Sequence, residues 1–225
     1  MPIFAPHLHQ RLAAAFVRGT ITDMNELFNK VLFELKDQQI NELIEIGQRH
    51  GLKLSVFYNA QELNLYAKVI QLLKNIQPDN LLDLGSGRGT FVWQFLDNFP
   101  FISLTVVENQ SRFVQNLQAV YKGGFGHLKI IPNKLTDLAV LQYFEFDVVT
   151  AIQVIEYLPD YQSFLKDICR LAKRFIVLTV AKNNSNPNCV HQFDEDEIRN
   201  MFGKLDIFQL KIESIPNYWI IIARK

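Results

Sequence analysis

The sequence lacks an excess of charge of either sign, and this narrows the partners that the protein can attract. Lysine plus arginine and aspartate plus glutamate number 23 each, so the formal net charge is zero. A protein without net positive charge has no long-range attraction for nucleic acid or for an anionic membrane surface. No stretch interleaves basic with aromatic residues either. Nucleic acid is therefore not favoured as a partner.

Cysteine and long apolar runs are also scarce. The two cysteines, Cys169 and Cys189, do not have the spacing of a metal site or of a disulfide framework, so we expect no metal and a reducing compartment, the cytoplasm. No run reaches the roughly 18 apolar residues that a membrane-spanning helix needs. Residues 1–22 contain two arginines and no acid, as some targeting helices do. They contain little serine, however, which favours an ordinary N-terminal helix.

Apolar residues are plentiful, at 48% of the chain, and their spacing divides the sequence in two. Before Gln77-Pro78-Asp79 they recur at helical intervals, which predicts helices over Phe4–Val17, from Thr22-Asp23 to Gly51, and over Asn59–Lys74. The aromatic side chains of these helices are expected to close over a pocket in the remainder. We assign residues 1–78 to an N-terminal helical cap and residues 79–225 to a second domain.

From Asn80 onward, short apolar runs alternate with helical patterns. Such alternation predicts a parallel sheet with helices on both faces. The expected strands are Leu81–Leu84, Ser103–Val107, Leu128–Ile131, Phe146–Ala151 and Arg174–Val180. The expected helices between them are Thr90–Asn98, Ser111–Tyr121, Leu138–Tyr143 and Tyr161–Leu171.

The end of the chain departs from this alternation. After a helix near Glu195–Met201, the β-like segments Phe208–Ser214 and Tyr218–Ala223 are joined by a short loop that contains Pro216. Strands joined so closely can only be antiparallel, since a parallel return needs a long crossover. The sequence therefore predicts an α/β fold with a mostly parallel sheet of seven strands that ends in an antiparallel hairpin.

One stretch of the second domain carries a binding motif. A strand that ends at Asp83-Leu84 is followed by Gly85-Ser86-Gly87-Arg88-Gly89, and helical spacing resumes at Phe91. Glycines let the backbone approach a ligand closely, and the first turn of a helix offers unpaired N–H groups. This arrangement is typical of nucleotide binding.

Residues 80–225 resemble a class I S-adenosylmethionine-dependent methyltransferase domain. The first motif of that family, acid-x-Gly-x-Gly-x-Gly, is complete at residues 83–89, and the acid expected at the end of the second strand is Glu108. The segment FDVVTAIQVIEYLPD, residues 146–160, resembles the fourth strand of the family, and the terminal hairpin resembles its added strand pair. The resemblance implies a Rossmann-like fold and S-adenosyl-L-methionine as the cofactor.

The resemblance also implies a set of cofactor-binding residues. Asp83 orients the glycine loop and the ammonium group of the cofactor, and Glu108 accepts both ribose hydroxyls. Many relatives place an acid near the adenine after the third strand, where this chain has Asn133. The full set is Asp83, Gly85, Ser86, Gly87, Gly89, Glu108, Asn109, Asn133, Gln153 and Val154. An NAD-dependent oxidoreductase is disfavoured, because its fingerprint requires a third glycine where this chain has Thr90.

Three residues are candidates for a general base. A base is needed only where the acceptor is a hydroxyl, a protonated amine or an acidic carbon. Glu156 and Tyr157 follow the fourth strand, and His191 lies in the loop after the fifth. Many relatives have histidine where this chain has Tyr157, so a role as base does not transfer to that position. Glu156 as a solvated helix-start acid and His191 as a local packing residue are the alternatives.

The sequence thus predicts methyl transfer to the O, N or C nucleophile of a small molecule that the helical cap encloses. Two alternatives stay open. The acceptor of the methyl group is RNA or a protein side chain, or the chain is a catalytically silent subunit that binds the cofactor for a partner. Neither the identity of the acceptor nor the oligomeric state follows from the sequence.

Overall fold

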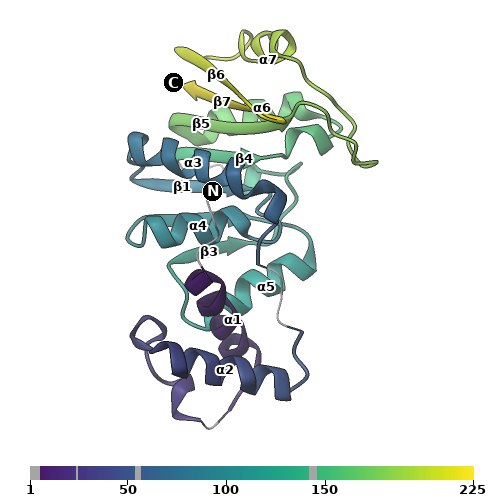
Figure 1. The fold of residues 1–225 in the computed structure, drawn as a ribbon. Helices are drawn as coiled ribbons and strands as arrows, with labels where there is room; N and C mark the ends of the chain where they lie inside the picture. The colour runs from purple at the N-terminus through teal and green to yellow at the C-terminus, as the bar shows by residue number, and fades with distance from the viewer. Residues whose placement is uncertain (1–5, 24, 54–56, 142–145) are drawn as a thin grey trace.

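The computed structural model describes residues 6–23, 25–53, 57–141 and 146–225, and a seven-stranded sheet runs through it (Figure 1). The strand order is β3-β2-β1-β4-β5-β7-β6. Strands β1 to β5 pair in parallel, and β7 pairs antiparallel with both β5 and β6. This confirms the predicted Rossmann-like methyltransferase sheet and its terminal hairpin. The strands are β1 (Asn80–Leu84), β2 (Ser103–Val107), β3 (Leu128–Ile131), β4 (Phe146–Ile152), β5 (Ala172–Ala181), β6 (Gln209–Ile215) and β7 (Tyr218–Arg224).

Helices cover both faces of the sheet, because the central strands are apolar on both sides. Leu81 and Val148 belong to a hydrophobic cluster shared with the first five helices, while their neighbours Leu82 and Val149 belong to a second cluster shared with the last two. None of the helices in the described ranges is both long and apolar enough to span a bilayer. They are α1 (Pro6–Thr20), α2 (Asp37–Arg49), α3 (Leu63–Ile76), α4 (Thr90–Asn98), α5 (Ser111–Lys122), α6 (Tyr161–Leu171) and α7 (Glu195–Phe202).

The single helix predicted from Thr22-Asp23 to Gly51 is wrong in its first half. Only α2 is α-helical there, and residues 26–28 and 32–34 form two 3-10 turns. The side chains of Asp23 and Asn25 accept the backbone N–H groups of Asn25 and Leu27, at 2.8 and 2.9 Å. Such local bonds compete with a helix for the same donors.

The helix predicted at Leu138–Tyr143 is not seen either. Within the described residues this stretch holds a 3-10 turn at Ala139–Leu141, and residues 142–143 lie outside them. Most of the remaining predicted helices agree with the structure to within two residues. The first, α1, ends later than predicted, and residues 4–5 of its predicted range lie outside the described residues. The third, α3, follows a 3-10 turn at Ala60–Glu62.

The N-terminal helices occupy two different places. Helix α1 packs against α5, and α2 packs against α1 at the end of the molecule beyond β3 (Figure 1). Helix α3 packs against α4 and lies in front of the sheet. Only α3 is therefore placed near the carboxyl ends of β1 and β4, and the domain boundary at residue 78 stays a prediction.

The crossing of α1 and α5 depends on two glycines. A Cβ atom at Gly123 would lie 1.8 Å from the carbonyl oxygen of Ala15, and one at Gly19 would lie 1.8 Å from that of Ala119. We expect Gly123→Ala to force the helices apart and to lower the free energy of unfolding by about 2–3 kcal/mol, as overpacked cores do. Urea denaturation of the two proteins measures this difference.

A matched control is Gly203→Ala. Both glycines follow a helix, at Gly123 with φ −73° and at Gly203 with φ −63°, but a Cβ atom at Gly203 would come no closer than 3.3 Å to another heavy atom. Equal effects of the two substitutions would contradict close helix packing as the reason for Gly123.

Candidate functional site

The glycine loop after β1 leaves room for a ligand at one point. Gly85, Gly87 and Gly89 have φ values of 78°, 53° and 81°, in the left-handed region. A Cβ atom at Gly85 would lie 2.8 Å from the Val154 side chain, and one at Gly89 would lie 2.6 Å from that of Trp93. At Gly87 it would meet nothing within 4 Å. The loop backbone at Gly87 therefore borders open space.

Glu108 ties this loop to the end of β2. The side chain is 4% exposed, and one carboxylate oxygen accepts the N–H of Gly87 at 2.8 Å. The other oxygen accepts the N–H groups of Asn109 and Gln110, both at 2.8 Å. A carboxylate offers about four acceptor positions, so roughly one remains for a ligand hydroxyl in this conformation.

Asp83 lies beneath the loop and is almost completely buried, at 2% exposed. Its carboxylate accepts the hydroxyl of Thr150 at 2.7 Å. Burial raises the pKa of Asp83 to about 6; the hydroxyls of Ser86 and Thr150 oppose this shift, and the charge of Glu108 adds to it. The carboxylate thus faces the loop from below and not the solvent.

The other predicted cofactor residues lie along the same edge. Gln153 follows β4 with φ 54°, and its N–H donates to the carbonyl of Thr179 at 3.0 Å. Backbone strain of this kind in a residue other than glycine is frequent at functional sites. The Asn133 amide donates to the carbonyl of Asp137, which leaves its own oxygen available as an acceptor. Asn109 contributes its backbone N–H to Glu108.

Glu156 is a completely buried carboxylate at the next position along this edge. One of its oxygens accepts the N–H of Ala181, at the end of β5, at 2.9 Å. The other oxygen has no hydrogen-bond partner in the part of the chain that the structure describes. Burial raises the pKa of Glu156 to about 7, against two opposing backbone hydrogen bonds.

Two tyrosines, Tyr157 and Tyr218, lie near this carboxylate. Tyr218 begins β7 and is paired with Ala181 of β5. Burial and then the charges of Glu62, Tyr157 and Glu156 raise the pKa of Tyr218. The Tyr157 hydroxyl accepts the side-chain amide of Asn184 at 3.0 Å.

Helix α3 contributes Tyr66 to the surroundings of this group. The hydroxyl of Tyr66 donates to Glu62 at 2.5 Å, and the pKa of Tyr66 lies well above its usual value because of burial and then the charge of Glu62. No sequence motif indicates a role for Tyr218. The antiparallel pairing of the hairpin with β5 is the signal that would have placed it beside the end of β5.

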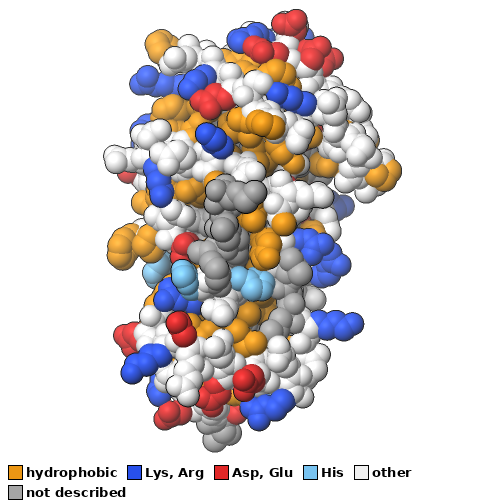
Figure 2. Space-filling model, viewed as in Figure 1, with side chains coloured by type: hydrophobic (Ala, Val, Ile, Leu, Met, Phe, Trp, Pro, Cys, Tyr) orange, Lys and Arg blue, Asp and Glu red, His pale blue; other side chains and the backbone are white. Residues whose placement is uncertain are grey.

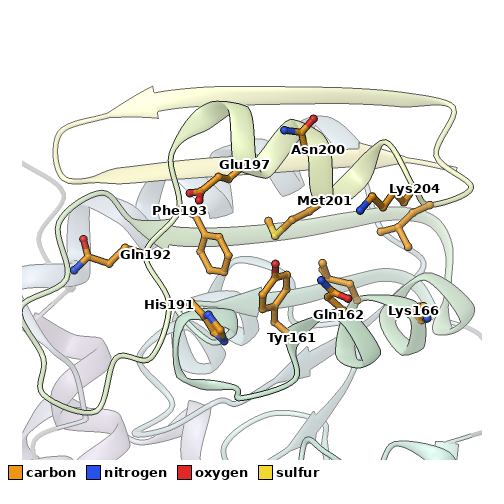
Figure 3. Close-up of a pocket in the computed structure, with 12 residues that line it drawn as sticks. Tyr161, Gln162, Lys166, His191, Gln192, Phe193, Glu197, Asn200, Met201 and Lys204 are labelled. Carbon is orange, nitrogen blue, oxygen red and sulfur yellow. The ribbon is translucent and has the colours of Figure 1, made fainter.

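His191 does not join these residues with its ring. Its N–H donates to the carbonyl of Glu156 at 3.1 Å, but the ring lies against Tyr161, with centroids 4.9 Å apart. Its Nε2 is 3.3 Å from the carbonyl oxygen of Pro159. The ring lines a pocket between α6 and α7 (Figure 3). Of the three candidate bases, Glu156 and Tyr157 thus lie together, and His191 faces elsewhere.

No group of three or more His, Cys, Asp or Glu side chains within the described ranges is placed to hold a metal ion. The polar groups of the site are backbone N–H groups, carboxylates, amides and phenols.

Residues 82–174 match a family model described as a methyltransferase domain. A search of curated proteins gives no match. Among solved structures, an O-methyltransferase family protein from Burkholderia thailandensis is similar, with a TM-score of 0.63 and 13% identity over 84% of this chain. The matched region spans 60% of that protein.

Two further solved structures are similar over most of their own length. The magnesium protoporphyrin IX methyltransferase from Synechocystis, solved with bound SAH, has a TM-score of 0.56 and 14% identity over 85% of this chain and 89% of its own. An N-methyltransferase from Bradyrhizobium japonicum has a TM-score of 0.58 and 17% identity over 74% of this chain and 97% of its own. At these identities the likeness establishes the fold.

Proposed function

We propose that the chain is a class I S-adenosylmethionine-dependent methyltransferase, that it binds this donor along the carboxyl edge of the sheet, and that it methylates a small molecule there. The observation that carries the proposal is the glycine loop fastened by Glu108, with open space over Gly87. A ligand at this position can approach the loop backbone directly. The first turn of α4 adds unpaired N–H groups.

The residues present fit the donor. Glu108 keeps an acceptor position for a ribose hydroxyl, Asn133 keeps an acceptor oxygen for the adenine amino group, and Asp83 holds the loop from below. Gln153 and Val154 lie where the methionine part would run. When bound, the cofactor supplies an activated methyl group on a sulfonium. The protein then has to orient the acceptor and exclude water. In favourable cases this lowers the activation free energy of the transfer by about 7–11 kcal/mol.

The acceptor belongs on the side of the site formed by Glu156, Tyr157 and Tyr218. The unpaired oxygen of Glu156 is the atom that would take the proton that an O–H or N–H acceptor loses. Its pKa of about 7 suits a base that works near neutral pH. The phenols can hold a polar acceptor by hydrogen bonds.

A small acceptor fits the enclosure of this group better than RNA or a protein side chain. Glu156 is fully buried, and Tyr66 of α3 is 8% exposed. On the face shown in Figure 2, basic and acidic side chains are interspersed and form no single-sign patch.

The test is transfer of label from methyl-tritiated S-adenosylmethionine into fractionated cell extract. We expect the label in the low-mass fraction, because the acceptor is a small molecule. Label in RNA or in protein would overturn the small-molecule acceptor. No transfer to any fraction, together with calorimetric binding of S-adenosylhomocysteine, would identify a silent cofactor-binding subunit.

The control uses two glycines with the same backbone constraint. Gly87 has φ 53° and Gly51 has φ 73°, and a Cβ atom at either would meet nothing within 4 Å. Gly87→Leu and Gly51→Leu therefore carry similar strain, on the order of 1–2 kcal/mol. We expect only Gly87→Leu to lose label transfer, since its side chain would fill the ligand space.

A further inference from the structure

A second pocket, of about 300 Å³, lies between α6 and α7, on the far side of the loop that follows β5 (Figure 3). The N–H groups of Val190 and His191 donate to the Glu156 carbonyl at 2.8 and 3.1 Å. Glu156 itself does not line the pocket. The His191 ring lies on the pocket side.

Aromatic rings and a thioether form one wall of this pocket. The Tyr161 ring stands nearly perpendicular to those of His191 and Phe193, with centroids 4.9 and 5.1 Å apart. In Figure 3 the Tyr161 hydroxyl points toward Met201. Such a wall offers ring edges and a polarizable sulfur, which suit a planar aromatic group.

Two lysines lie at the opposite end. Lys166 comes from α6 and Lys204 from the turn after α7, and both line the pocket (Figure 3). Neither forms an ion pair with any side chain that the structure describes. The acid in the lining is Glu197, whose carboxylate accepts the N–H of Asp194 at 2.9 Å and lies toward Phe193 in the close-up. The lysine end of the pocket therefore has two exposed ammonium groups without an ion-pair partner among the described residues.

We propose that this pocket binds a small aromatic anion, with its ring beside Tyr161 and Met201 and its anionic group between Lys166 and Lys204. The volume is at the lower end for small-molecule sites, which suits one ring system and not a peptide. Because none of the predicted cofactor-binding residues lines this pocket, binding here does not need the methyl donor. The proposal is independent of the acceptor proposed above.

The probe is 1-anilinonaphthalene-8-sulfonate, an aromatic anion whose fluorescence rises on binding, titrated into the full chain. We expect Lys166→Gln/Lys204→Gln to weaken its binding about tenfold, since two ion pairs with exposed lysines are lost. Neutral N-phenyl-1-naphthylamine should bind this variant and the original protein equally. Saturating S-adenosylhomocysteine should not displace the anionic probe.

The control variant is Lys53→Gln/Lys122→Gln, which removes two exposed lysines away from the pocket and should bind the probe unchanged. Met201→Trp, which fills the pocket, should abolish binding of both probes. Unchanged binding of the anionic probe to Lys166→Gln/Lys204→Gln would overturn the proposal. So would its displacement by S-adenosylhomocysteine, which would place the probe in the cofactor site.

Discussion

Glu108→Gln is expected to lower the affinity for S-adenosylhomocysteine by at least about 100-fold, the equivalent of about 2.7 kcal/mol. The Glu108 carboxylate accepts three backbone N–H groups, from Gly87, Asn109 and Gln110. Each hydrogen bond to an ionised group contributes about 1.5–3 kcal/mol. A glutamine keeps one acceptor oxygen and turns an NH₂ group toward N–H donors, so the loop loses its anchor before any ligand contact is counted.

Isothermal calorimetry measures this affinity, and circular dichroism verifies that the variant is folded. Glu45→Gln is the matched control, because Glu45 is an exposed glutamate on α2 and should leave the affinity unchanged. Binding by Glu108→Gln within threefold of the original protein would contradict both the anchoring of the loop and the position of the cofactor.

The strands and the glycine loop could be predicted because their signals are local. All seven residues of β4 are buried, and the sequence shows this as a run that is apolar apart from Asp147 and Thr150. The loop is recognisable because Gly85, Gly87 and Gly89 each require a left-handed backbone or close packing at a fixed spacing. Neither feature depends on a distant part of the chain.

Features that apolar spacing does not record could not be predicted. One of them is local: the hydrogen bonds that the side chains of Asp23 and Asn25 accept in place of a helix turn. Another depends on distant contacts: α1 crosses α5 so closely that a Cβ atom at Gly123 would lie 1.8 Å from the carbonyl oxygen of Ala15. No pattern in either helix indicates this crossing.

The acceptor side of the site shows the same limit of local patterns. Glu156 meets Ala181 and Tyr218 only through the register of β4, β5 and β7. The sequence indicates Glu156 as a residue after the fourth strand, but not its complete burial or the hydrogen bonds that its carbonyl accepts from Val190 and His191. The roles of the individual site residues stay predictions, which the ligand titrations above address.

Glu156 should also make the stability of the fold depend on pH, with a loss of about 3 kcal/mol as pH rises from about 4.5 to 8. Its folded pKa is about 7, above the ordinary value of 4.5, because burial favours the protonated form. In this window the folded state binds more protons than the unfolded state, so the free energy of unfolding falls as pH rises and levels off above pH 7. Asp83, with a pKa of about 6, adds a second loss at lower pH.

Glu156→Gln separates the two contributions, because the amide keeps an acceptor for the Ala181 N–H and does not titrate. Urea denaturation at pH 5 and pH 8 should show the variant gaining about 3 kcal/mol relative to the original protein over this range. Glu45→Gln, at an exposed position on α2, should differ from the original protein by the same unfolding free energy at both pH values. If the difference in unfolding free energy between Glu156→Gln and the original protein is also the same at pH 5 and pH 8, Glu156 is solvated and the acceptor side is open. The argument for an enclosed small acceptor would then fail.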